Sequence, residues 1–373
     1  MEKMSLYTAG IADFEKIRQS NRIYVDKTDL IYKMTKESGF IFLSRPRRFG
    51  KSLLCSTLKY YFQGRKDLFE GLAMAHLETE WKQYPVLHFD MSKCKNGHDV
   101  KGVRMGIEKQ LENYEVLYGR DEKESTMGMR LTGLIERAHN KTGLRTVVII
   151  DEYDAPLLAY YNTADYNESR RILLEFTTPL KCNDADEQFV FITGITELPY
   201  EPTVNNFSRL SDTYQCASIC GFTHEEMLSV FEKEILCLAE KNNCSRDEII
   251  EQLHLRYGGY QFDTDELNVY NPYCLMKTFE TQQMGKYWAT NEMVTSLKEQ
   301  LQRFNDNGWR NFSEMAMDSS LFYKPLDENS PFSFLYENGV FTIKSARRYN
   351  FHYQYTIGFP NTEAKEAFSK IAS

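Results

Sequence analysis

The residues with the clearest chemical role are Gly50, Lys51 and Ser52, which end the stretch RPRRFGKS at residues 45–52. In a phosphate-binding loop, consecutive backbone N–H groups surround the phosphates, a lysine reaches the terminal phosphates, and a hydroxyl holds Mg²⁺. The three residues supply the end of the pattern GxxxxGK[ST], whereas Arg45 stands where the first glycine belongs. Because a bare GKS tripeptide also occurs by chance in exposed loops, the assignment depends on the surrounding sequence.

Two consecutive carboxylates, Asp151 and Glu152, form the second candidate group. They follow an apolar, β-branched run at residues 147–150, which is typical of a strand buried on both faces of a parallel sheet. Such sheets bind ligands at the carboxyl ends of their strands. We therefore expect Ser52 and Asp151 to hold Mg²⁺, and Glu152 to orient or deprotonate an attacking water, with Lys51 completing the catalytic set. The alternative is that the two carboxylates only cap a turn.

The expected nucleotide-binding set is the loop itself, namely Arg47, Arg48, Phe49, Gly50, Lys51, Ser52 and Leu53. The two arginines either face the phosphates or pair with carboxylates of a neighbouring domain, and the sequence does not decide between these roles. Asp154 is either a second carboxylate beside the metal or the cap of the next helix. Thr193 and Thr196 end the strand QFVFIT and would sense a γ-phosphate if that strand lies next to the others; the alternative is ordinary turn hydroxyls.

The elements around these residues follow the order that a phosphate loop needs. A predicted strand at residues 40–43 leads into the loop and a predicted helix at residues 52–62 leaves it. Further strands are predicted at residues 23–25, 85–90, 147–150 and 188–193, and further helices at residues 28–36, 100–117 and 128–139. The alternation predicts an α/β fold, a P-loop NTPase with a doubly wound, mainly parallel sheet, over residues 1–215.

The rest of the chain has a different pattern. Residues 216–298 are predicted as a smaller helical module, with helices at residues 223–243 and 245–255 that begin at the caps Thr223 and Ser245. Residues 257–272 are predicted as a hairpin or loop whose aromatics either pack in the core or form a stacking platform. Residues 299–373 are predicted as a C-terminal α+β extension, in which Asn338 and Gly339 indicate a hairpin.

Composition limits the partners and the compartment. The net charge of −8 gives no overall attraction to nucleic acid or anionic lipid, so either would need a local basic patch. The eight cysteines are scattered, no signal peptide is evident, and no window of about 18 apolar residues exists. These features predict a cytoplasmic protein with reduced thiols and no membrane span.

Several segments together resemble the AAA-ATPase-like family of mostly bacterial P-loop proteins. The matching segments, in the order of that family's landmarks, are YVDKT (24–28), FIFLSRPRRFGKSLL (40–54), VVIIDEYDAPL (147–157), FITGIT (191–196), ICGFTHEEM (219–227), YGGYQF with VYNP (257–272) and IGFPNTEAK (357–365). The resemblance implies that Arg45 is the family's own variant of the loop and that ATP and Mg²⁺ are the cofactors.

Two features differ from the family pattern. Glu197 stands where relatives often carry a basic residue, and Arg209 is a substitute cation that the sequence does not test. The family commonly carries a C-terminal nuclease domain of the P-D-(D/E)-x-K superfamily, whereas the last hundred or so residues hold no such carboxylate and lysine core. We therefore expect no nuclease activity from this chain, and a nuclease domain or another protein as its partner.

The leading hypothesis is a Mg²⁺-dependent ATP-binding protein and slow ATPase. Its nucleotide state would act as a switch on an attached or partner domain. The alternative is a non-hydrolysing module that binds protein or nucleic acid through its aromatic 257–272 region and uses ATP only for stability.

Overall fold

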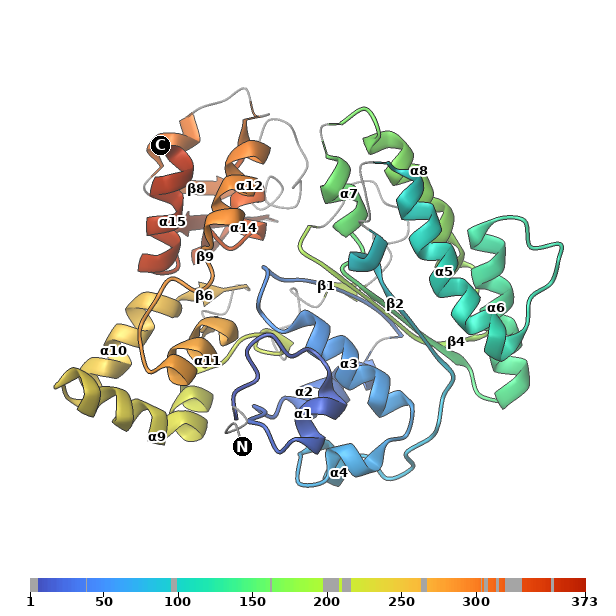
Figure 1. Ribbon diagram of the computed structural model, residues 1–373, viewed down its shortest axis with the longest axis horizontal. Coiled ribbons are helices and arrows are strands. Elements are labelled where there is room, and N and C mark those ends of the chain that lie inside the picture. The colour runs from blue at the N-terminus through green and yellow to red at the C-terminus, as the bar shows by residue number, and fades with distance from the viewer. Residues whose placement is uncertain are drawn as a thin grey trace.

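The structure is a computed structural model of the 373-residue chain. It describes residues 6–37, 39–94, 99–161, 163–196, 208–209, 216–262, 267–302, 304, 308–312, 315–318, 331–349 and 352–373. A parallel sheet with helices on both sides lies beside a second group of helices and strands formed by the C-terminal part of the chain (Figure 1).

The sheet contains five parallel strands in the order β2-β3-β4-β1-β5. They are β1 (Phe40–Ser44), β2 (Val86–Asp90), β3 (Thr146–Asp151), β4 (Glu187–Gly194) and β5 (Ser208–Arg209). The third strand is buried along its whole length, as expected for an apolar run with helices on both faces. The predicted parallel α/β architecture is therefore confirmed.

Alternate side chains of the strands face two separate hydrophobic clusters. One face packs against the helices α1 (Phe14–Gln19), α2 (Thr28–Glu37), α3 (Lys51–Phe62) and α4 (Met74–Leu77), with the 3₁₀ helix η1 (Lys66–Phe69). The other face packs against α5 (Lys101–Tyr118), α6 (Met127–Thr142), α7 (Ala155–Tyr160) and α8 (Tyr166–Thr177), with η2 (Met91–Cys94) and η3 (Thr178–Lys181). Figure 1 shows α3 and the group of α5, α6 and α8 on opposite sides of the strands.

Most of the C-terminal part shares one hydrophobic cluster, which runs from α9 to α15, whereas Tyr260, Phe262 and Val269 belong to the cluster on the α3 face of the parallel sheet. Its helices are α9 (His224–Asn242), α10 (Arg246–Tyr257), α11 (Pro272–Thr281), α12 (Asn291–Leu301), η7 (Gly308–Asn311), α14 (Pro331–Glu337) and α15 (Thr362–Ala372). Its strands are the antiparallel pair β6 (Tyr260–Gln261) and β7 (Asn268–Val269), and the sheet β8-β10-β9 made of β8 (Met315–Asp318), β9 (Thr342–Tyr349) and β10 (His352–Gly358).

Local signals explain several of these elements. Helices α9 and α10 both begin with a capping box. The side chains of Thr223 and Ser245 accept a hydrogen bond from the third helical N–H, and the glutamate at that third position accepts one from the backbone N–H of the cap residue. Residues 257–272, which are predicted as a hairpin or a loop, contain the antiparallel pair β6 and β7. The domain boundaries after residues 215 and 298 stay predictions.

Two predicted elements are wrong. Residues 23–25 form no strand and join no sheet in the described part of the chain. Asn338 and Gly339 do not connect two strands: they follow α14, and the backbone N–H groups of both residues bond to carbonyls of that helix. Gly339 has a φ of 77°. Glycine favours a positive φ both in hairpin turns and just after helices, and here it ends a helix. Within the described residues, no helix is both long and apolar enough to cross a membrane.

Candidate functional site

The loop after β1 turns sharply before α3 begins. Arg48 has a φ of 71° and Gly50 a φ of 94°, both in the left-handed region. A residue with a side chain would be strained at Gly50 whatever space surrounded it, because the Cβ atom disfavours this backbone conformation. The chain therefore forms the predicted strand, tight glycine turn and helix around Lys51 and Ser52. As at the start of any helix, the first backbone N–H groups of α3 have no intrahelical partners.

Lys51 is buried at the centre of this arrangement. Its Nζ donates to the carbonyls of Arg45 and Pro46, at 2.9 and 3.0 Å. Burial lowers the pKa of Lys51, and the nearby charges of Glu152, Asp154 and Asp151 oppose that change. The carboxylates of residues 151–154 therefore lie close enough to the phosphate loop to act on the charge of Lys51.

Arg45, which replaces the first glycine of the common pattern, has a structural role. It is 2% exposed, and its guanidinium donates to the carbonyls of Ser44 and Ala217, the latter at 3.2 Å. The same group lies 4.5 Å from the centre of the Phe262 ring, at cation–π distance. The arginine therefore attaches the loop to residues that come more than 170 positions later.

The other side chains of the loop point in different directions. Phe49 is buried and packs edge-on against Tyr260, with ring centres 4.8 Å apart, so the aromatics of residues 257–272 are core residues here. Arg47 and Arg48 are both exposed on the loop and line the adjoining cavity. The Arg48 guanidinium lies 4.6 Å from the ring centre of Tyr273 on α11.

The two carboxylates occupy the end of β3, as expected. Asp151 is 5% exposed, and burial raises its pKa to about 6; the negative charge of Glu152 adds to this, while a hydrogen bond from Ser52 and the charge of Lys51 oppose it. Within the described residues, Asp151 Oδ1 has no hydrogen-bond partner. Glu152 lines the cavity with a φ of 50°, a strained conformation of the kind that concentrates at functional sites.

Asp154 has a role that the sequence did not suggest. It occupies the N-cap position of α7, but its side chain makes no capping hydrogen bond, so the helix-cap interpretation is wrong. Its Oδ2 accepts instead from the backbone N–H groups of Ile195 and Thr196, both at 2.8 Å. Asp154 therefore fixes the chain where it leaves β4.

Strand β4 lies between β1 and β3, so the condition attached to the sensor hypothesis is met. Thr193 pairs with Leu43 of β1 and is fully buried, and its Oγ1 has no hydrogen-bond partner in the described part of the chain. The Thr196 hydroxyl donates to Glu337 Oε2 on α14 at 3.0 Å. Their sensor roles stay predictions.

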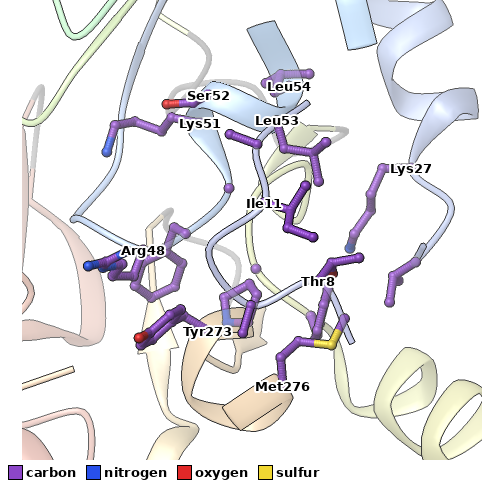
Figure 2. Close-up of a pocket in the computed structure, with 18 of the residues that line it drawn as sticks. Thr8, Ile11, Lys27, Arg48, Lys51, Ser52, Leu53, Leu54, Tyr273 and Met276 are labelled. Atoms are coloured by element: carbon purple, nitrogen blue, oxygen red, sulfur yellow. The ribbon is translucent and has the colours of Figure 1, made fainter. Parts of the chain in front are cut away.

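A cavity of about 440 Å³ brings the loop together with four other parts of the chain. Residues 47–54, Thr57 and Glu152 line one part of it. The rest is lined by residues 8–12, residues 23–25 with Lys27 and Ile31, Ile219 with Gly221 and Phe222, and Pro272 with Tyr273 and Met276. Figure 2 shows Lys51 and Arg48 on one side and Lys27 and Met276 on the other. The Lys27 ammonium, which burial shifts to a lower pKa, pairs with Glu226 at 2.5 Å. No sequence motif assigns a binding role to these residues.

The comparisons with known proteins agree with the geometry of the loop. The model of the family described as Predicted AAA-ATPase matches residues 8–201, which is more than half of the chain. The chain is also 29% identical over 369 residues to an uncharacterized protein in the vnfD 5′ region of Azotobacter chroococcum mcd 1, with 97% of this chain and 68% of that protein covered.

Proposed function

Because this chain belongs to the predicted AAA-ATPase family, we propose that it binds Mg²⁺–ATP in the 440 Å³ cavity and hydrolyses it slowly. The observation that carries the proposal is that one cavity is lined by the phosphate loop and by Glu152. The N–H groups at the start of α3 and the Lys51 ammonium would bind the phosphates.

The far side of the cavity suits the nucleoside. Ile11, Ile23 and Met276 line it, and they offer apolar surface of the kind that encloses a heteroaromatic ring. Residues 8–12 and the pair Tyr273 and Met276 are far apart in the sequence but line the same cavity, so a bound nucleotide would contact both. We therefore assign the base to this side and the phosphates to the loop.

The residues at the end of β3 suit Mg²⁺ in their chemistry. Mg²⁺ prefers oxygen ligands, and the Ser52 hydroxyl is near enough to the Asp151 carboxyl to lower its pKa. The buried Asp151 Oδ1, which lacks a partner among the described residues, is an oxygen that a cation or its water shell would satisfy. Bound there, the ion would neutralise phosphate charge, while Glu152 would orient the attacking water and accept its proton.

We propose further that the nucleotide state is transmitted to the C-terminal part of the chain and from there to an attached or partner domain. Three contacts support this: Thr196 bonds to Glu337, Arg48 stacks on Tyr273, and a Cβ added to Gly339 would lie only 2.9 Å from Pro46 Cβ. Each joins the nucleotide side to an element beyond residue 216. A shift of the loop or of β4 would therefore move these elements too.

Nucleotide binding by wild type and by Lys51→Ala tests the phosphate assignment. We expect at least a tenfold loss of ATP affinity, about 1.4 kcal/mol, because the variant loses a buried cation. Lys66→Ala removes an exposed lysine elsewhere and serves as the control. Equal affinity in wild type and Lys51→Ala would exclude this role for the loop.

Turnover by Glu152→Gln tests the hydrolytic step separately. The variant should still bind ATP, because glutamine keeps the shape of the side chain, yet it should lose at least about a hundredfold in turnover as it cannot accept a proton. Unchanged turnover in this variant would remove Glu152 from the mechanism while leaving the binding proposal intact.

A further inference from the structure

Three side chains of types that bind transition metals meet beneath the phosphate loop. Cys55 lies on α3, His88 on β2 and Asp151 at the end of β3. Each offers one ligand atom, and the three atoms all lie within 4.8 Å of one another. His88 pairs with Ile149 across the two strands, so both point to the face of the sheet that α3 covers.

The cluster is shielded from solvent, since Asp151 is 5% exposed and Cys55 is fully buried. Asp151 Oδ1 and His88 Nε2 are both buried without a hydrogen-bond partner in the described part of the chain. Leaving such atoms unpaired is costly, and a bound cation would satisfy the carboxylate and the imidazole together.

The ligand atoms indicate which class of metal fits. A thiolate sulfur, an imidazole nitrogen and a carboxylate oxygen form a set that suits zinc and its neighbours among the divalent transition metals. Mg²⁺ avoids sulfur and nitrogen and prefers oxygen ligands, so Cys55 and His88 discriminate against it. Three protein ligands also leave a fourth position of a tetrahedral ion for water.

We propose that Cys55, His88 and Asp151 bind a divalent transition-metal ion of the zinc class, and that this ion competes with Mg²⁺ for Asp151. The thiol of Cys55 gives its proton to solvent when the metal–sulfur bond forms, and no electron is transferred. The competition rests on the proposed function, since it assumes that Asp151 serves Mg²⁺ at the nucleotide site. Binding of the metal itself does not require ATP.

Titration with Co²⁺ as an optical substitute for zinc tests the site directly. The wild-type chain, reduced and freed of metal, should gain a near-ultraviolet thiolate-to-cobalt band and visible bands at one equivalent. Cys55→Ser should abolish the thiolate band, and His88→Gln should weaken Co²⁺ binding at least tenfold. Cys216→Ser removes an equally buried thiol outside the cluster and should leave the band unchanged.

Each result of the Co²⁺ titration either supports or overturns the metal site. Absence of a thiolate band in wild type overturns the proposal, as does a band that survives Cys55→Ser or that disappears in Cys216→Ser. Far-ultraviolet circular dichroism of each variant checks folding, and His88→Gln provides an independent arm if Cys55→Ser does not fold. A tenfold loss of Co²⁺ affinity in His88→Gln alone then supports the site, and undiminished affinity refutes it.

The competition is tested by ATP turnover at fixed free Mg²⁺ with increasing free Zn²⁺. Wild type should be inhibited, and Cys55→Ser should need at least tenfold more Zn²⁺ for half inhibition. Equal sensitivity of wild type and Cys55→Ser would refute the competition. A chain that binds Co²⁺ through Cys55 but turns over no ATP would contradict the proposed function and leave the metal site standing.

Discussion

Glu187, the first residue of β4, provides a sharp test of the fold because its carboxyl group is buried. It is 4% exposed, and both carboxyl oxygens lack a hydrogen-bond partner among the described residues. Burial raises its pKa from 4.5 to about 8, and the negative charges of Asp184 and Asp186 act in the same direction. The folded chain therefore keeps a proton that the unfolded chain loses.

The direction and size of the effect follow from this difference. Below pH 4.5 both states hold the proton, and ionisation of Glu187 has no effect on stability. Between pH 4.5 and about 8 only the unfolded state releases the proton, so stability falls as pH rises. One pKa unit corresponds to about 1.4 kcal/mol, which gives an upper value of about 5 kcal/mol. Because water penetration relieves part of the burial cost, we expect about 2–4 kcal/mol.

The assay is urea unfolding of wild type and Glu187→Gln at several pH values from 5 to 9. Glutamine carries no charge, so the free energy of unfolding of the variant minus that of wild type should rise with pH and level off above about pH 8. Subtracting the two curves cancels the other titrating groups. Glu240→Gln, at an exposed position, should show no such trend. A difference between wild type and Glu187→Gln that stays constant over this pH range would refute the reasoning.

Three further substitutions test the contacts around the loop and β4. Arg45→Gly restores the common loop pattern but removes a buried guanidinium, so thermal denaturation should show that the free energy of unfolding falls by about 2–4 kcal/mol. A variant as stable as wild type would contradict the anchoring role of Arg45. Asp154→Ala leaves the N–H groups of Ile195 and Thr196 without their acceptor and should cost about 3–5 kcal/mol in urea unfolding; a cost under about 1 kcal/mol would be incompatible with these bonds. A double-mutant cycle of Thr196→Val and Glu337→Met, which removes the acceptor, should give a coupling energy of about 1 kcal/mol, whereas independent effects would show that their hydrogen bond contributes nothing.

The parts of the fold that depend on neighbouring residues could be predicted from the sequence. The strand before the loop and the helix after it were expected at residues 40–43 and 52–62, and they form as Phe40–Ser44 and Lys51–Phe62. The caps at Thr223 and Ser245 were also identified, because a capping box is completed within four residues. Such signals need no knowledge of the rest of the chain.

Features that depend on distant residues could not be predicted in the same way. The cavity joins residues 8–12 to residues 272–276, and no spacing in the sequence indicates that contact. The sequence allows Asp154 to be a metal carboxylate or a helix cap, yet its Oδ2 holds the end of β4, which is distant in sequence but adjacent in the sheet. Strand order decides which side chains meet, and strand order is a property of the whole domain.

The anchoring of Arg45 also bears on how the chain is made. The loop is synthesised well before its supports, the carbonyl of Ala217 and the ring of Phe262. We therefore expect a nascent chain that ends before residue 216 to carry the motif without a loop held in its final shape. A fragment cut at the boundary predicted after residue 215 would contain every residue expected to contact the phosphates and still bind ATP poorly.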